Sequence, residues 1–214
     1  HVLCWKDLIP VASFVLLGGK CRYCKKKISL GYPSIEILTA VLFVWIFNYF
    51  SLGLAVFYSV IACLLIFIFV YDLKHFIIPD SLVFSAIGLA LLGKIVMSLN
   101  AKDPFILYDA LAAGFLAGLF FLIIFLVSQG KWMGFGDVKL VLFMGIFLGF
   151  PLILVALFLS FLTGGAAGTF LILSKKKNLK SEIPFGPFLA LGTFAALFWG
   201  QKILTWYLEF ILAA

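Results

Sequence analysis

The sequence predicts an all-α, polytopic membrane protein with about seven spans and a short N-terminal segment outside the bilayer. Of its 214 residues, 65% are hydrophobic and only 12% are charged, whereas soluble chains average about 45–50% apolar and about 25% charged residues. A soluble protein of this composition would lack the polar surface that water requires. The apolar residues also fall into runs of about 20, the length that a helix needs to cross a bilayer.

Polar and helix-breaking residues divide the apolar sequence into seven candidate spans and a last amphipathic or re-entrant segment at about 202–213. The run 134–173 is long enough for two spans, and Gly149-Phe150-Pro151 is a natural tight turn between them. Residues 1–33 are expected to form a cytoplasmic segment, and 34–214 the membrane-embedded domain. The predicted spans cover roughly 34–50, 54–71, 80–99, 107–128, 135–150, 152–173 and 185–200.

The basic residues predict an orientation for these spans. If residues 1–33 are cytoplasmic and each span reverses direction, 13 of the 16 Lys and Arg residues fall on the cytoplasmic side, all except Lys94, Lys102 and Lys202. Cytoplasmic loops carry an excess of Lys and Arg, so the span count passes an independent test. The formal net charge of +7 has the same explanation, and we expect no nucleic-acid partner.

The segment Gly134-Phe135-Gly136-Asp137 places an acid between glycines and an apolar run. An Asp at the centre of a membrane helix costs about 2.5–3.5 kcal/mol on insertion scales, which favours a functional reason for its presence. Glycines allow another backbone or an extended substrate to approach closely. The alternative is that Asp137 simply caps a helix that begins at the membrane interface.

Asp72 closes an apolar run that extends from Ser59 to Tyr71. A negative charge at a helix C-terminus interacts unfavourably with the helix dipole, so capping does not explain this acid. The alternation of spans places Asp72 and Asp137 at the same, cytoplasmic face. Asp80, which follows Pro79, is instead expected to be the N-cap of the next helix.

Two carboxylates at one membrane face could act as a catalytic pair. At a separation of about 4 Å and an effective dielectric of about 20, their repulsion is about 4 kcal/mol, which holds the last proton about a thousandfold more tightly. The ionised acid would deprotonate a water molecule while the protonated acid donates to a scissile carbonyl oxygen. Whether Asp72 or Asp137 is the base stays open, because a coupled pair shares its protons.

Together these segments resemble the GxGD aspartyl proteases, specifically the type IV prepilin peptidase family. The similarity includes Asp72 within an Asp-(x)6-Pro-Asp pattern and Gly134-Phe135-Gly136-Asp137 followed by Lys139-Leu140. It runs from about residue 5 to residue 192, in the family's order. Further matching motifs are Asp7-Leu8-Ile9-Pro10, Gly19-Lys20-Cys21-Arg22-Tyr23-Cys24, Ile28-Ser29, Tyr32-Pro33-Ser34-Ile35-Glu36 and Pro184-Phe185-Gly186-Pro187-Phe188-Leu189-Ala190.

The resemblance implies an aspartic endopeptidase with Asp72 and Asp137 as its catalytic residues. It would remove the basic leader of type IV prepilins or pseudopilins at the cytoplasmic face of the bacterial inner membrane, so these proteins and the lipid bilayer are its expected partners. Many family members also N-methylate the new terminus with S-adenosylmethionine. The resemblance therefore implies methyl transfer as a possible second activity of this chain. The residues expected to support the site are Gly134, Gly136, Lys139, Glu36, Pro184, Gly186 and Pro187.

Several of these supporting residues have a second interpretation. Glu36 lies in the predicted first turn of a span, where it would stabilise the helix dipole; otherwise it takes part in methylation or substrate binding. Pro184 and Pro187 should interrupt a helix, and a broken helix at membrane depth needs protein or a water cavity beside it, so this segment is expected to line the cleft. Lys139 should point away from Asp137 on a regular helix and is expected to be a basic anchor.

The N-terminal segment carries one complete Cys-x-x-Cys pair, Cys21 and Cys24. Longer family members carry two such pairs, which together suit a tetrahedral Zn²⁺ site, and His1 with Cys4 is a candidate for the second half here. The alternative is free, reduced thiols in the cytoplasm. Zinc would be structural, since proteolysis by two aspartates needs no cofactor. Because residue 1 is His, we expect the natural chain to begin further upstream.

Three other functions stay open from the sequence. A preflagellin-type or other GxGD protease would cleave without methyl transfer. A transporter or proton channel would use intramembrane Asp for ion relay, but it predicts acids near the bilayer midplane. A non-catalytic scaffold for pilus assembly would tolerate the loss of either Asp72 or Asp137.

Overall fold

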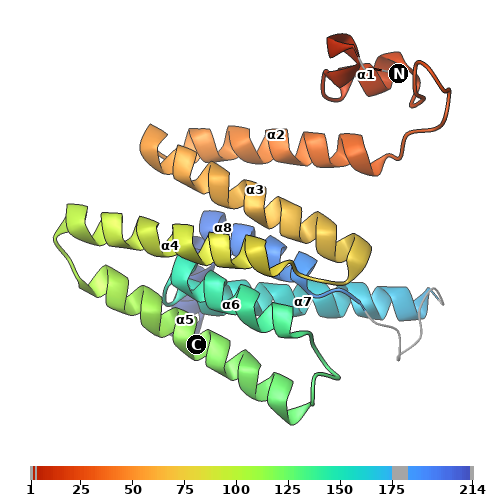
Figure 1. Cartoon of the computed structure of the whole chain (residues 1–214). Helices are drawn as coiled ribbons and strands as arrows, with labels where there is room; N and C mark the ends of the chain where they lie inside the picture. Colours follow the sequence, from red (N-terminus) through yellow and green to blue (C-terminus); the bar gives the residue numbers. More distant parts are fainter. Residues whose placement is uncertain (1, 3, 175–182, 213–214) are drawn as a thin grey trace. The chain divides into compact units, whose positions relative to one another are not determined.

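The structure of the protein is a computed structural model that describes residue 2 and residues 4–174 and 183–212. Within these residues the chain forms one 3₁₀ helix and eight α-helices, with no β-strand beyond an isolated bridge (Figure 1). The predicted all-α class is therefore confirmed.

Six of the described helices are long and apolar enough to cross a membrane. The helix α6 (Phe135–Leu148) has 14 residues and a length of about 21 Å, which is less than the hydrocarbon thickness of about 30 Å. The six long helices and the shorter α6 agree with the expected number of about seven. The long helices are α2 (Gly31–Tyr49), α3 (Leu52–His75), α4 (Asp80–Ala101), α5 (Phe105–Val127), α7 (Leu152–Leu173) and α8 (Gly186–Leu212).

Two helix boundaries correct the sequence prediction. The helix α8 continues without a break to Leu212, so a separate segment over 202–213 is wrong as far as the described residues extend. A Cβ on Gly200 would lie 2.8 Å from Leu152 Cδ2, which shows that this glycine serves close packing against α7 and does not end the helix. The helix α2 begins at Gly31, and Glu36 therefore lies beyond its first turn.

The chain divides into two compact units, His1–Cys63 and Leu64–Ala214. The first unit contains a 3₁₀ helix (Trp5–Leu8), α1 (Ala12–Leu16), α2 and the beginning of α3. The second unit contains the end of α3 and the helices α4 to α8. Both Asp72 and Asp137 belong to this second unit, so its packing decides whether they can meet.

Glycines bring the backbones of α5 and α6 into contact. A Cβ on Gly145 would lie 2.5 Å from Gly114 Cα, and a Cβ on Gly118 would lie 3.1 Å from Leu142 Cβ. Small residues at a membrane helix interface allow this close approach, and van der Waals contact then stabilises the pair. The contact holds α6, which carries Asp137 in its first turn, firmly against α5.

Polar contacts at its two ends fix the direction of α6. Just beyond its C-terminus, the Phe150 N–H donates a hydrogen bond of 3.1 Å to Asp109 Oδ2, near the beginning of α5. Near its N-terminus, Lys139 forms an ion pair with Asp80, the first residue of α4. The helix α6 therefore runs antiparallel to α5, and its first turn lies at the same end of the second unit as the α3–α4 connection.

Candidate active site

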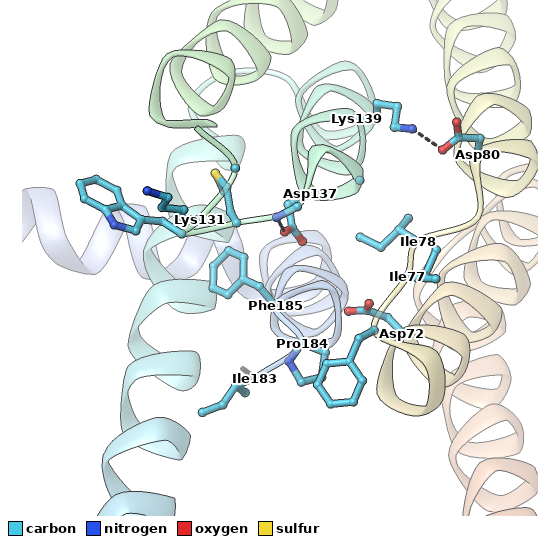
Figure 2. A pocket seen from close by; sticks show the side chains of 16 residues that line it. Asp72, Ile77, Ile78, Asp80, Lys131, Asp137, Lys139, Ile183, Pro184 and Phe185 are labelled. Atoms are coloured by element: carbon cyan, nitrogen blue, oxygen red, sulfur yellow. Dashed lines mark hydrogen bonds and ion pairs between the residues drawn. The ribbon is translucent and has the colours of Figure 1, made fainter. Parts of the chain in front are cut away.

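A pocket of about 860 Å³ opens at this end of the second unit (Figure 2). Among the described residues, its lining comes from three stretches of the chain, 72–80, 130–139 and 183–185. These stretches hold the end of α3 with the loop to α4, the loop into α6 with its first turn, and the segment before α8. Residues that are far apart in the sequence thus form the walls of one cavity.

Asp72 lies in the last turn of α3 and is only 4% exposed. Its Oδ2 accepts a hydrogen bond of 3.0 Å from the Gly186 N–H, at the first residue of α8. The chain reverses directly after α3, where Phe76 adopts a φ of 57°. The N-terminus of α8 carries partial positive charge and stabilises the carboxylate of Asp72. This contact explains why an acid is tolerated at the C-terminus of α3.

Asp137 is the third residue of α6 and is 7% exposed. Its Oδ2 accepts a hydrogen bond of 3.1 Å from the Gly134 N–H, so the carboxylate does cap its own helix. It also lines the pocket. The capping and functional interpretations of this acid are therefore compatible.

The two carboxylates face the same cavity from different walls (Figure 2). Both ion pairs found among the described residues involve other acids, so neither Asp72 nor Asp137 is neutralised by a cation there. Two buried acids without a cation favour a state in which one of them keeps its proton. This is the arrangement that acid–base catalysis by two aspartates requires.

Ile78 lies between Gly136 and Gly186 and was not singled out from the sequence. A Cβ on Gly136 would lie 2.9 Å from Ile78 Cβ, and a Cβ on Gly186 would lie 3.2 Å from Ile78 Cδ1 and 2.6 Å from Asp72 Oδ2. A side chain at position 136 or 186 would therefore collide with Ile78 or Asp72, and only glycine fits at both positions. In a chain this apolar, an isoleucine gives no sequence signal of such a role.

Asp80 corrects one sequence prediction. The N-cap position of α4 is Pro79, and the Asp80 side chain makes no cap hydrogen bond. It pairs instead with Lys139 of α6, as the dashed line in Figure 2 marks. The Pro79-Asp80 pattern predicted an N-cap. The Asp80 carboxylate is instead positioned by Lys139, which is distant in the sequence.

Comparison with known proteins identifies the family. A family model described as "Type IV leader peptidase family" matches residues 59–169, and one described as "Bacterial Peptidase A24 N-terminal domain" matches residues 1–50. The chain belongs to the type IV leader peptidase family. Both Asp72 and Asp137 lie in the part that the leader peptidase model matches.

Individual relatives of the leader peptidase family cover almost the whole chain. A prepilin leader peptidase/N-methyltransferase of Legionella pneumophila is 32% identical over 98% of this chain and 72% of its own length. Proteins with the same name are 35% identical in Aeromonas salmonicida, over 99% of this chain and 73% of theirs, and 31% identical in Bacillus subtilis, over 96% and 81%. No solved structure matches this chain.

The other residues expected to support a leader peptidase site lie in different places. Gly134, Lys139 and Pro184 line the pocket. Pro187 is buried in the first turn of α8 and is not among the residues described as lining it. Phe185 does line the pocket, and its ring lies 5.2 Å from that of Phe161 on α7, which anchors the segment before α8.

Glu36 belongs to the first unit of this leader peptidase. Its Oε2 accepts a hydrogen bond of 2.7 Å from the Val11 N–H. Val11 has a φ of 59°, which is rare for a β-branched residue. Glu36 therefore ties the turn before α1 to α2, and the dipole explanation based on a first-turn position is wrong.

The Cys-x-x-Cys pair belongs to a short hairpin of the first unit, and both thiols are free. Cys21 and Cys24 lie in a hairpin that is closed by hydrogen bonds from the Cys21 N–H to the Lys26 carbonyl (2.9 Å) and from the Lys25 N–H to the Cys21 carbonyl (3.1 Å). The Cys24 N–H lowers the pKa of the Cys21 thiol. His1 lies outside the described residues, and among those described no three His, Cys, Asp or Glu side chains converge to hold a metal ion.

Proposed function

We propose that the chain is an intramembrane aspartyl endopeptidase. It removes the basic leader of type IV prepilins or pseudopilins at the cytoplasmic face of the bacterial inner membrane. The observation that carries the proposal is that two buried acids, Asp72 and Asp137, line one pocket at one end of the second unit. The names of the relatives, all prepilin leader peptidases, support the substrate class.

The hydrogen bonds of the pair suit this chemistry. Oδ2 of Asp72 is oriented by the Gly186 N–H, and Oδ2 of Asp137 by the Gly134 N–H. The ionised acid takes a proton from a water molecule, whose oxygen attacks the scissile carbonyl carbon. The protonated acid donates to the carbonyl oxygen, and the resulting intermediate collapses as the amine leaves with a proton. This sequence needs no metal and no covalent intermediate.

The rim of the pocket suits a substrate with an apolar segment. Trp132 is 76% exposed, and Phe76 and Ile77 are also exposed beside the cavity. An exposed apolar cluster at a pocket marks a binding surface. We propose that these side chains contact the apolar helix that follows the leader of a prepilin.

The proposal is tested by replacing each acid with its amide. In membranes that contain a candidate prepilin, Asp72→Asn and Asp137→Asn should each abolish leader cleavage almost completely. Asp103→Asn is a matched control, because Asp103 lies outside the pocket and accepts a hydrogen bond from the Phe105 N–H, which an amide oxygen can also accept. Cleavage retained by either Asp72→Asn or Asp137→Asn would overturn the mechanism.

We also propose that the chain methylates the newly exposed N-terminus with S-adenosylmethionine. The support is the name N-methyltransferase that the relatives share. The test is transfer of a labelled methyl group to the cleaved product in the same membranes. Cleavage without transfer would assign the chain to the peptidases that lack this second activity, as in the preflagellin type.

A structural Zn²⁺ in the N-terminal segment is a separate proposal. The Cys-x-x-Cys spacing of Cys21 and Cys24 is typical of two ligands of a tetrahedral zinc site. Cys4, whose Sγ accepts a hydrogen bond of 3.4 Å from the Tyr23 hydroxyl, lies beside the same hairpin. We propose His1 as the remaining ligand. Metal analysis of the purified protein should find one zinc per chain and its loss in Cys21→Ser; a metal-free wild-type protein would contradict the proposal.

A further inference from the structure

Lys139 occupies an unusual position for a cation. It lies on α6 two residues after Asp137, and its side chain is only 15% exposed. Its Nζ forms an ion pair with Asp80 (Figure 2). It also lies 5.1 Å from the ring centroid of Phe135 and 5.9 Å from that of Phe84. One ammonium group therefore contacts a carboxylate and two aromatic rings from two helices.

These contacts explain how a cation is retained near the beginning of α6. A positive charge near a helix N-terminus interacts unfavourably with the helix dipole, and a buried charge without a partner is strongly destabilising. The carboxylate of Asp80 and the electron-rich faces of the two rings compensate for both effects. The ion pair therefore links α6, just beyond its first turn, to the first residue of α4.

The ion pair between Lys139 and Asp80 also affects Asp72, because Asp80 and Asp72 are joined by the short α3–α4 loop. The helix α4 begins immediately after the loop 76–79, which follows the turn of α3 that carries Asp72. Within this loop, Ile78 is packed against the Gly136 and Gly186 positions. Fixing Asp80 against Lys139 therefore holds the loop, and with it the wall of the pocket that carries Asp72, at a set distance from Asp137.

We propose that Lys139 is a positioning residue of the catalytic pair, acting through its ion pair with Asp80. This inference rests on the proposed function of Asp72 and Asp137 and goes beyond it. Lys139 does not contact the reacting atoms. It holds the two acid-bearing walls together and sets the charge that surrounds the shared proton.

The charges that line the pocket indicate how Lys139 affects the protonation of the catalytic pair. The lining includes three acids, Asp72, Asp80 and Asp137, and two cations, Lys131 and Lys139, while the stretch 183–185 carries no titratable side chain. With one proton on the catalytic pair, the lining residues that the structure describes are together formally neutral. Removing the charge of Lys139 leaves them negative, which favours the protonated pair. Removing the charge of Asp80 leaves them positive, which favours the ionised pair.

The test compares Lys139→Met, which keeps the apolar stem, with Asp80→Asn and with Lys139→Arg. Both Lys139→Met and Asp80→Asn should lower kcat for leader cleavage by about tenfold or more with little change in KM, because misplacement of catalytic groups affects the chemical step. Lys139→Arg keeps the charge and the ring contacts and should retain most of the activity. Lys102→Met, at the exposed end of α4, is the matched control and should cleave as the wild type does.

Two further readouts separate positioning from general destabilisation. The double variant Asp80→Asn/Lys139→Met should be no slower than the slower single variant, since the two residues act as one unit. The pH–rate profile of Lys139→Met should move to higher pH and that of Asp80→Asn to lower pH. A merely structural role would lower the amount of folded protein and leave both profiles in place, and that result would overturn the proposal.

The experiment also distinguishes this inference from the proposed function. Asp72→Asn is measured in the same assay. If Asp72→Asn is inactive while Lys139→Met or Asp80→Asn cleaves as fast as Lys102→Met, only the positioning role is wrong. If Asp72→Asn cleaves, the catalytic pair itself is wrong, and the inference about Lys139 is overturned with it.

Discussion

The Gly186 N–H donates a hydrogen bond to Asp72 Oδ2 at 3.0 Å, although 114 residues separate the two in the sequence. This contact turns the N-terminus of α8 toward an acid at the C-terminus of α3. The partial positive charge of a helix N-terminus stabilises a carboxylate placed there. The residues directly before α8, Ile183, Pro184 and Phe185, line the same pocket as Asp72.

Gly186→Ala should impair leader cleavage without preventing folding. A Cβ at this position would lie 2.6 Å from Asp72 Oδ2, so the carboxylate must move, and a displacement of this size reduces the rate by about tenfold or more. Initial cleavage rates per folded protein in detergent measure the effect. Gly165→Ala is the control, because nothing lies within 4 Å of its Cβ. Equal rates for the two variants would show that the Gly186 contact is dispensable.

Gly145→Ala should destabilise the second unit. Its Cβ would lie 2.5 Å from Gly114 Cα and 2.6 Å from the Ala113 carbonyl oxygen, and backbone atoms cannot yield without separating α5 from α6. Overpacking of this kind costs about 1–3 kcal/mol, which thermal unfolding in detergent would detect as a lower Tm. Gly88→Ala, whose Cβ meets nothing within 4 Å, should keep the wild-type Tm. An unchanged Tm for Gly145→Ala would contradict the close helix contact.

Asp109→Ala should also lower the Tm, for a different reason. The Phe150 N–H donates to Asp109 Oδ2 in an exposed hydrogen bond, and removing the acceptor costs about 0.5–1.5 kcal/mol, the usual net contribution of such a bond. Asp109→Asn should lower the Tm less, because its amide oxygen can still accept the bond. If the two variants unfold at the same temperature, the hydrogen bond contributes nothing to stability.

The thiol of Cys21 should ionise at lower pH than an ordinary thiol. The N–H groups of Cys24 and Tyr23 and the Cys24 side chain lower its pKa, so the thiolate appears as the pH rises through a value below about 8.5. The rate of alkylation of Cys21 against pH, followed by mass spectrometry, gives this midpoint. Cys24→Ser should raise the midpoint, and added Zn²⁺ should suppress alkylation. A wild-type midpoint at or above that of a free thiol would refute the prediction.

The positions of the two acids were predictable because they follow from regular features. Apolar runs of helical length and the distribution of Lys and Arg predicted that Asp72 and Asp137 share one face, and the family motifs predicted their importance. The structure places both in one pocket, together with Gly134, Lys139 and Pro184. For both acids, the local sequence motif and the alternating direction of the helices led to the same prediction.

The remaining features depend on contacts between distant segments, which no local pattern encodes. Asp80 looked like an N-cap, and only the proximity of α4 and α6 reveals its pairing with Lys139. The last predicted span ended near residue 200, but α8 continues to Leu212, and Gly200 is a packing site for Leu152. The role of Ile78 between Gly136 and Gly186 likewise has no signature in so apolar a sequence.

The central claim is that Asp72 and Asp137 act as one catalytic unit, and a double-mutant cycle on leader cleavage tests it most directly. Initial rates are measured for Asp72→Asn, Asp137→Asn and the double variant under the same conditions. For residues that act as a unit, losses are not additive, so all three variants should fall to the same residual rate. A single variant that retains cleavage, or a double variant slower than both singles by the product of their separate losses, would contradict the account.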